Sequence, residues 1–509
     1  MIAKISSAVP RGVEALPVQV EVESHHGLPA LAVVGLPDAA VREARERVLT
    51  AIRHLGATLD ARSIVVNLSP AEERKEGSLL DLPIATGLLT TSSLLPHHAA
   101  ADLWLVGELS LDGALRPVRG ILPIVEAATR AGAGVVVPFD NLAEAVVVRG
   151  ARVIPVHTLK ELVAHLRGER LIAAVLGRNG HTQNPPVERY LDLADVAGQE
   201  QAKRALEIAA AGGHNLLLLG PPGAGKTMLA QRLPGILPPL TEEEALATTK
   251  IYSVATGVER PRGLLWRRPF RAPHHSISPA GLVGGGSIPR PGEVSLAHNG
   301  VLFLDEITEF RRDVLEVLRQ PMESGNVVLT RAAASLTFPA RFQLVAAANP
   351  CPCGFLGDAR RECRCSPREV ARYRSRLSGP LLDRIDLQLE VPAVPYRELA
   401  APAAREGSQA VVRRVAAARE VQQARLAGTN RRTNADMTPA DLRRHCAVDR
   451  EGARLLERAM DKLALSARGL NRILKVARTI ADLDGSPGLL PRHLAEAIAY
   501  RTLDRRSPG

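Results

Sequence analysis

The segment GPPGAGKT at 220–227 has the residue types and spacing of a phosphate-binding loop. It follows the apolar run LLLL and precedes MLAQRL, which has a helical pattern. Its glycines permit backbone conformations that point successive N–H groups at anionic oxygens. Lys226 would place a positive charge at the β and γ phosphates of a nucleotide, and Thr227 would offer its hydroxyl to Mg²⁺. The plain alternative, a glycine turn with a chance lysine, is disfavoured by the complete match in its expected context.

Two acidic residues and an asparagine extend this site. Asp305 ends the apolar run VLFLD, where it can hold Mg²⁺ through water, and Glu306 beside it is a natural general base for an attacking water. Asn349 ends the run FQLVAAAN and can orient that water, although a strand-end turn at Asn-Pro is the alternative. These parts specify hydrolysis of a nucleoside triphosphate, with ATP and Mg²⁺ as the expected ligands. The residues expected to contact the nucleotide are Gly220, Pro221, Pro222, Gly223, Ala224, Gly225, Lys226, Thr227 and Met228.

A second cluster has metal-ligand chemistry. Cys351, Cys353, Cys363 and Cys365 form two C-x-C pairs, and four thiolates at the ends of a short loop suit a tetrahedral zinc site. Four reduced thiols near a strand end are the alternative, and an iron–sulfur cluster is less favoured. The chain has 5 Cys in all. This number argues against a disulfide framework and for a reducing compartment, so we expect a cytoplasmic protein.

The pattern of apolar residues indicates the elements that must position these groups. Residues 191–395 alternate strand and helix patterns, which is typical of a parallel sheet. The continuous apolar runs at 216–220, 301–305 and 342–348 predict strands that are buried on both faces. The predicted fold class is therefore α/β. The predicted organisation is an N-terminal α/β domain at 1–176, a linker at 177–190, the sheet domain at 191–395 with a Cys-rich insertion at 351–365, a helical connector at 396–434 and a C-terminal helical lid at 435–509.

In the N-terminal region, strand patterns at 18–24, 31–36, 63–69, 103–111 and 134–138 are separated by helical patterns at 38–56 and 79–95. Asp38 is the expected cap of the first helix and Gly56 its expected end. No apolar run approaches the roughly 20 residues that span a bilayer. The N-terminal residues also lack the apolar core of a secretory signal, so we expect no membrane association.

The charge distribution indicates the class of partner. Residues 1–178 carry 18 Lys and Arg against 19 Asp and Glu, whereas residues 179–509 carry 47 against 35. Five arginines without an acid lie in 260–271, and seven with two glutamates lie in 360–376. A solvated face is one explanation, but contact with the phosphates of a nucleic acid accounts better for the clustering.

Four longer strings allow a more specific interpretation: RPFRAPHHSIS (268–278), GLVGGGSIPRPGEVSLAHNGVLFLDE (281–306), NPCPCG (349–354) and SGPLLDRIDL (378–387). Together with the phosphate-binding loop they resemble the YifB/ComM family of magnesium-chelatase-like AAA+ ATPases, over essentially the whole chain. The resemblance implies a hexameric ring with ATP between subunits. For the ComM branch it implies a DNA-driven ATPase and branch-migration helicase that acts on single-stranded and branched DNA during DNA uptake and recombination.

The same resemblance assigns three arginines. Arg384 matches the finger that a neighbouring subunit supplies to the γ-phosphate, although without the family match an ion pair with Asp383 or Asp386 would be favoured. Arg468 matches the sensor-2 arginine of the lid, with Arg472 one turn further along as its alternative. Residues 325–348 resemble a hairpin that enters the ring pore in related helicases. Arg331 lies at its turn and is expected to contact a DNA phosphate, with a surface arginine as the alternative.

The N-terminal region resembles the Lon-protease-like domain fused to this family, through the segments 75–89 and 107–128. Lon enzymes use a Ser/Lys dyad, but Leu79 and Leu122 stand where those residues should be, and Ser78 is out of register. We therefore expect a scaffold without protease activity. Two further functions remain open for the whole chain: a chelatase-type ATPase that remodels a magnesium-inserting partner, and a protein-remodelling chaperone.

Overall fold

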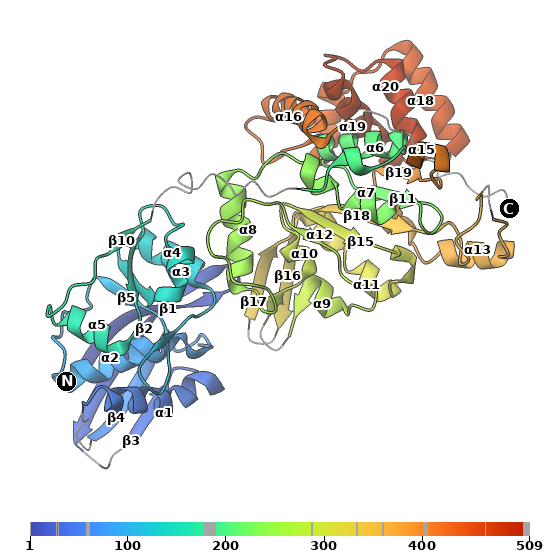
Figure 1. Ribbon diagram of the computed structural model, residues 1–509. Coiled ribbons are helices and arrows are strands. Elements are labelled where there is room, and N and C mark those ends of the chain that lie inside the picture. Colours follow the sequence, from blue (N-terminus) through green and yellow to red (C-terminus); the bar gives the residue numbers. More distant parts are fainter. Residues whose placement is uncertain are drawn as a thin grey trace.

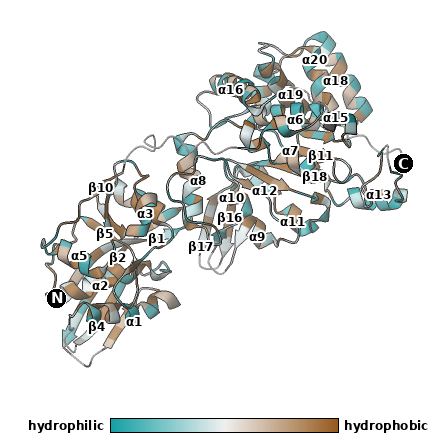
Figure 2. Cartoon of the chain, in the orientation of Figure 1, coloured by the Kyte–Doolittle hydropathy of each residue, from teal (hydrophilic) through white to brown (hydrophobic). Residues whose placement is uncertain are grey.

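The computed structural model describes residues 2–26, 28, 30–57, 62–177, 190–286, 289–331, 334–358, 361–400, 406–463 and 465–501. It has an N-terminal α/β domain at one end, a parallel-sheet core in the middle and a group of C-terminal helices packed beside the core (Figure 1). Apolar residues are concentrated in the core strands, among them β11 and β18, and in α2, whereas α13 is largely polar (Figure 2). None of the helices in these described ranges combines the length and the apolar character that a membrane span requires.

The N-terminal domain is built on one eight-stranded sheet. Its longest contact is the antiparallel pair β1 and β2, in which all ten residues of β1 are paired. In sheet order the strands are β10 (Val175–Leu176), β9 (Arg152–Val156), β8 (Gly134–Pro138), β5 (Leu103–Leu105), β1 (Ile2–Arg11), β2 (Glu14–His26), β4 (Arg62–Ser69) and β3 (Ala30–Val34). A small separate ladder joins β6 (Glu108–Leu109) to β7 (Leu115–Arg116).

Helices cover this sheet. They are α1 (Ala39–His54), α2 (Asp81–Thr91), α3 (Ile121–Arg130), α4 (Leu142–Ala145) and α5 (Leu159–Leu166). The predicted cap of α1 is confirmed, since Asp38 accepts a hydrogen bond from the Val41 N–H at 2.8 Å, and Gly56 follows the helix with a φ of 80°. Every residue of α2 is buried, so α2 is the central core helix of the domain.

The core is a five-stranded parallel sheet in the order β12 (Phe270–Arg271), β15 (Val301–Leu304), β18 (Gln343–Ala348), β11 (Leu216–Leu219) and β19 (Leu387–Glu390). All residues of β11, β15 and β18 are buried, as the apolar runs predicted. Two hairpins extend from the core, β13 (Gly284–Gly285) with β14 (Arg290–Pro291), and β16 (Asn326–Arg331) with β17 (Ala334–Pro339).

The core helices are α6 (Glu200–Gly212), α7 (Lys226–Ala230), α8 (Glu242–Val254), α9 (Pro279–Val283), α10 (Glu293–Leu296), α11 (Arg312–Glu316), α12 (Arg319–Ser324), α13 (Pro367–Arg374) and α14 (Gly379–Leu382). The C-terminal helices are α15 (Tyr396–Ala400), α16 (Ser408–Arg425), α17 (Pro439–His445), α18 (Arg450–Leu463), α19 (Ala467–Leu483) and α20 (Pro491–Ala499). Alternate strand residues form two apolar layers. Leu216 and Leu218 pack with the C-terminal helices, whereas Leu217 and Leu219 pack with the helices of the opposite face.

The N-terminal domain docks on the core through α3 and α8. The Gly120 N–H donates to Ser253 O at 2.9 Å, and Arg119 donates to backbone carbonyls at Ala255 and Val258. Glu144 bonds the Ser253 hydroxyl inside this contact, where burial raises the pKa of the Glu144 carboxyl to about 7. These bonds join α4 and the residues that precede α3 to α8 and to the segment that follows it, so the N-terminal domain contacts the core at the end of α8.

Candidate nucleotide site and cysteine cluster

The phosphate-binding loop connects β11 to α7 at the carboxyl edge of the parallel sheet. Gly223 and Gly225 have φ values of 77° and 86°, in the left-handed region that side chains with a Cβ rarely adopt. These two conformations turn the loop around a central space, and Gly225 directly precedes the first residue of α7. The loop therefore presents backbone N–H groups and a helix start to an anion, which is the arrangement that binds nucleotide phosphates.

Lys226 lies inside this loop and is almost completely buried. Its ammonium group donates to Gly220 O at 2.6 Å, to Pro221 O at 2.9 Å and to the Asn349 side-chain oxygen at 3.1 Å. Burial lowers the pKa of Lys226, and the charges of Asp305 and Glu306 partly oppose this. The ammonium is thus held by neutral acceptors, which phosphate oxygens can replace with a gain in charge pairing.

Thr227 and Asp305 form the candidate magnesium site. The Thr227 hydroxyl donates to the Asp305 carboxylate at 2.7 Å, across 78 positions of the chain. Two ligands at right angles around Mg²⁺, with bonds of about 2.1 Å, lie about 3 Å apart. The residues present therefore fit the ion. Asp305 reaches this position because β15 and β11 are parallel and end at the same edge of the sheet, with β18 between them.

Glu306 follows Asp305 with an exposed side chain and an unusual backbone. Its φ and ψ are 48° and 47°, a left-handed conformation that costs a residue with a Cβ about 1–2 kcal/mol. Its N–H donates to the Asp305 carboxylate at 3.0 Å. Strain of this kind concentrates at functional sites, and here it turns the chain sharply after the strand, beside the phosphate-binding loop.

Arg384 and Arg468 do not join this group. Both line a cavity of about 770 Å³, together with Asn215, Gly300 and Asp386, which directly precede β11, β15 and β19. The cavity therefore lies at the amino edge of the sheet. The phosphate-binding loop, Asp305 and Asn349 lie at the carboxyl edge, beyond strands about 10 Å long. Within one chain, the predicted arginines and the predicted phosphate site face opposite ways.

The cavity is basic, and the sequence had singled out three of its cations, Arg384, Arg468 and the alternative Arg472. Its lining holds nine basic side chains against five acidic ones. The additional ones are Arg268, Arg341, Arg419, Arg431, Arg432 and Lys475. They come from segments far apart in the sequence, so no motif connects them. Their excess of positive charge suits a polyanion such as a triphosphate.

Arg384 is well placed to act on a ligand in this cavity. Its side chain is 14% exposed, it pairs with Glu323, and one guanidinium nitrogen donates to Pro380 O at 2.5 Å. Its buried Nε has no hydrogen-bond partner among the described residues. Arg468 is exposed at the cavity wall. The alternative, Arg472, is already held by Asp386 at 2.7 Å.

Asp386 anchors the strand that follows Arg384. Burial favours a raised pKa for this carboxyl, but the His214 ring nitrogen 3.4 Å away and the charge of Arg472 outweigh it and hold the pKa of Asp386 below its usual range. The Asn215 N–H also donates to this carboxylate, at 3.2 Å. Asp386 is therefore a structural anchor and leaves Arg384 to face the cavity.

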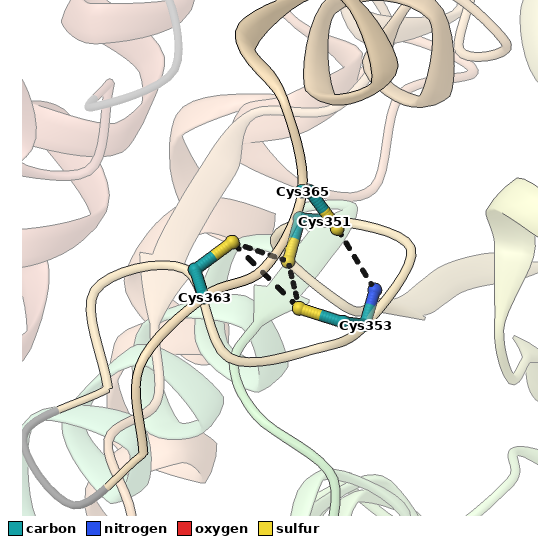
Figure 3. Close-up of side chains that lie close together, drawn as sticks. All are labelled: Cys351, Cys353, Cys363 and Cys365. Carbon is teal, nitrogen blue, oxygen red and sulfur yellow. Dashed lines mark hydrogen bonds between the residues drawn. The ribbon is translucent and has the colours of Figure 1, made fainter.

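The four cysteines meet as a compact cluster (Figure 3). The sulfur of Cys351 lies 3.3 Å from that of Cys353 and 3.6 Å from that of Cys363, and all four sulfurs lie within 4.8 Å of one another. A tetrahedral zinc site with Zn–S bonds of about 2.3 Å places its sulfurs about 3.8 Å apart. The cluster thus fits Zn²⁺ in spacing and in ligand chemistry.

The structure limits what the predicted basic segments can do. In 260–271, Arg268 pairs with Glu244 at 3.0 Å and Arg271 with Glu293 at 2.7 Å. These two arginines are partly buried and already paired with carboxylates, so contact with DNA phosphates is less expected for them than for the exposed arginines of the run. Arg331 ends β16, and its side chain lies outside the described residues. In 360–376 most described arginines, among them Arg368 and Arg372 on α13, are exposed.

In the N-terminal domain, Leu79 and Leu122 belong to the hydrophobic core, with exposed fractions of 5% and 0%. Ser78 is engaged with the Glu108 carboxylate. Lys75 is fully buried and bonds the backbone oxygens of Gly35 and Pro70. The two positions that carry the Lon dyad thus hold packing residues here, which supports the expectation of a scaffold without protease activity.

Comparisons with known proteins cover nearly the whole chain. Family models match residues 20–141 (Subunit ChlI of Mg-chelatase), 192–399 (Magnesium chelatase, subunit ChlI) and 405–501 (Magnesium chelatase, subunit ChlI C-terminal). The chain is 47% identical to YifB of Escherichia coli over 499 residues, covering 97% of this chain and 96% of that protein. It is 45% identical to the competence protein ComM of Haemophilus influenzae over 507 residues, covering 99% and 98%.

A shorter likeness concerns a protease. The chain is 31% identical to Lon protease 2 of Bacillus subtilis over 158 residues, which cover 28% of this chain and 27% of that protein.

Proposed function

The chain belongs to the YifB/ComM family of magnesium-chelatase-like AAA+ ATPases, and we propose that it is a ring-shaped motor that uses ATP hydrolysis to move along DNA. The observation that carries the proposal is the division of the nucleotide site. Lys226, Thr227 and Asp305 lie at one edge of the sheet, and the basic cavity with Arg384 lies at the other. A complete site therefore needs two copies of the chain.

This geometry favours a ring. Contact between the carboxyl edge of one copy and the amino edge of the next is heterologous, and repetition of such a contact closes a ring or extends a filament. Closed symmetry is the usual outcome for soluble proteins, and the family resemblance implies six subunits. Each copy then supplies the phosphate-binding loop to one site and Arg384 to another.

The residues divide the work of hydrolysis. The loop N–H groups and Lys226 bind the β and γ phosphates, while Thr227 and Asp305 hold Mg²⁺, which offsets negative charge on the phosphates. Glu306 accepts a proton from the attacking water, and Asn349 orients that water. The neighbouring Arg384 stabilises the charge that develops on the γ-phosphate. Arg468 from the same cavity supports the nucleotide across the interface.

Two features support DNA as the track. Residues 179–509 carry 47 Lys and Arg against 35 Asp and Glu, and the family resemblance connects ComM with the uptake of DNA. The β16–β17 hairpin extends from the core with Arg331 at its end. We assign this hairpin to the pore, with single-stranded and branched DNA as substrates.

Single-stranded DNA is expected to raise ATP turnover several-fold, and ATP is expected to drive branch migration of a three-strand junction. Arg331→Ala should weaken the stimulation at every DNA sequence, because a phosphate contact carries no base information. Arg458→Ala, an exposed arginine on α18, is the matched control and should stimulate normally. An ATP turnover rate that does not change when DNA is added would contradict the proposal.

The alternatives predict other activators. A protein-remodelling chaperone should be stimulated by unfolded protein in the same assay. The ATP turnover of a chelatase-type motor should be stimulated neither by DNA nor by unfolded protein, and should require a metal-inserting partner. The chelatase family models favour this second candidate, whereas the basic excess of the core and C-terminal regions favours the DNA motor.

We also infer that the cysteine cluster holds one Zn²⁺. The support is the sulfur spacing of 3.3–3.7 Å between Cys351, Cys353 and Cys363, which is close to that of a tetrahedral site. Metal analysis of protein purified without chelators should give about one zinc per chain, and Cys363→Ser with Cys365→Ser should lower it toward zero. Cys446, buried among the C-terminal helices, offers the control Cys446→Ser. Less than about half an equivalent in the unmodified protein would contradict the inference.

A further inference from the structure

The cysteine cluster contacts the nucleotide site from one side. Cys351 follows Asn349 by two residues, and the Asn349 side chain accepts a hydrogen bond from Lys226. The Cys351–Gly354 turn is closed by the Gly354 N–H, which donates to Cys351 O at 2.9 Å. Gly354 lies so close to the phosphate-binding loop that a Cβ there would stand 2.6 Å from Pro222. The turn that carries two of the sulfurs therefore packs directly on the loop.

The other pair of cysteines leads to the acidic side of the site. Cys365 precedes Ser366, which caps α13 in a reciprocal arrangement with Glu369. From α13, Tyr373 accepts a hydrogen bond from the Thr308 hydroxyl at 2.6 Å, and Thr308 lies two residues after Glu306. After the helix, Arg376 donates to Thr308 O at 3.0 Å.

The helix also returns to the start of the cluster. Arg374 donates to Pro350 O at 3.3 Å, between Asn349 and Cys351. The four sulfurs thus join two chain segments, of which one contacts Pro222 and Asn349 and the other contacts the turn after Glu306. A metal bound by all four sulfurs fixes these segments relative to each other, whereas without the metal they are joined by weaker contacts such as the hydrogen bond from Arg374 to Pro350 O.

We propose that Zn²⁺ at the four cysteines and nucleotide at the phosphate-binding loop bind cooperatively, so that each raises the affinity of the other. The proposal rests on the nucleotide and zinc sites proposed above. The physical basis is conformational entropy. Metal binding already fixes Pro222, Asn349 and Thr308, so nucleotide binding to the zinc-loaded protein loses less conformational entropy. Linkage requires the coupling factor to be the same in both directions.

The test uses the full chain, with ADP and Mg²⁺ as the nucleotide probe and Zn²⁺ as the metal probe. Calorimetry measures the Kd for ADP with zinc-loaded and zinc-stripped protein under reducing conditions. A competing chelator measures the Kd for zinc with and without ADP. We expect zinc removal to weaken ADP binding about tenfold, ADP to tighten zinc binding by the same factor, and added zinc to restore the original affinity.

Three variants sharpen the result. Cys363→Ser with Cys365→Ser should bind ADP as weakly as the stripped protein, and Cys446→Ser should behave as the unmodified chain. Tyr373→Phe keeps all four thiols and removes only the hydroxyl that meets Thr308. It should retain one zinc and show a smaller coupling factor, which a purely structural zinc would not predict. If the double variant does not fold, stripping and reloading the unmodified protein still decides the question.

The outcomes separate the proposals. Equal ADP affinity with and without zinc would overturn the cooperativity and leave the ATPase intact. Failure of zinc-loaded protein to bind ADP would instead overturn the proposed function. An unchanged coupling factor in Tyr373→Phe would contradict the route through α13.

Discussion

Lys226→Ala is expected to lower ATP turnover by about 10²–10³-fold or more, because it removes the only buried cation described at the phosphate-binding loop. The remaining loop N–H groups cannot replace a full charge at the β and γ phosphates. The Asn349 oxygen, which accepts from Lys226 at 3.1 Å, loses its donor as well. Turnover is measured as phosphate release with saturating single-stranded DNA, and branch migration should stop with it.

Lys462→Ala is the matched control, since Lys462 is exposed on α18 in the C-terminal helices. Surface changes of this kind usually alter stability by less than about 0.5 kcal/mol. Thermal unfolding of both variants shows whether the loss comes from chemistry or from folding. Branch migration by Lys226→Ala at the unmodified rate would show that branch migration does not depend on ATP hydrolysis, and would contradict the proposed function.

Arg384→Ala is expected to have an equally large effect for a different reason. A neighbouring arginine at the γ-phosphate contributes about 10³–10⁵-fold to turnover in other nucleotide hydrolases. Because Arg384 lies at the edge of the sheet opposite the phosphate-binding loop, its loss should leave the affinity of the loop for ADP within a few-fold. Calorimetry of ADP binding beside phosphate release tests both parts.

Mixing the two inactive variants tests the assignment to a neighbouring subunit. A site that takes its loop from Arg384→Ala and its arginine from Lys226→Ala is complete. In a random equal mixture about a quarter of head-to-tail interfaces are of this kind. Turnover should therefore return to a measurable fraction of the unmodified rate. A mixture as inactive as its components, although subunits exchange, would contradict a site shared between copies.

Much of the fold was readable from local patterns. The continuous apolar runs predicted β11, β15 and β18, because strands buried on both faces need apolar side chains at every position. The cap of α1 at Asp38 followed from a short-range hydrogen bond between neighbours in the chain. The strand β1 was not predicted, since Ser6, Ser7 and Pro10 interrupt its apolar pattern and only the pairing with β2 defines it.

The site divides in the same way. Gly220 to Thr227 form one continuous segment, so the phosphate-binding loop could be identified from the sequence alone. The sequence assigned Thr227 and Asp305 to the same magnesium ion, and the two side chains meet because strands of a parallel sheet end at a common edge. The hydrogen bond from Thr308 to Tyr373 could not be predicted from the sequence, because neither residue type in isolation indicates a partner 65 positions away.

The sequence by itself determined which chemistry the chain carries, namely a phosphate-binding loop, an acidic pair after a strand and four cysteines at metal-ligand spacing. These features depend on residue type and short spacing, which a linear pattern preserves. Only the tertiary structure decided where the arginines lie. Arg384 precedes β19 and so emerges at the amino edge, whereas Gly220 follows β11 and emerges at the carboxyl edge. Strand direction is a property of the assembled sheet, and it places Arg384 and the phosphate-binding loop, the two halves of the proposed nucleotide site, at opposite edges.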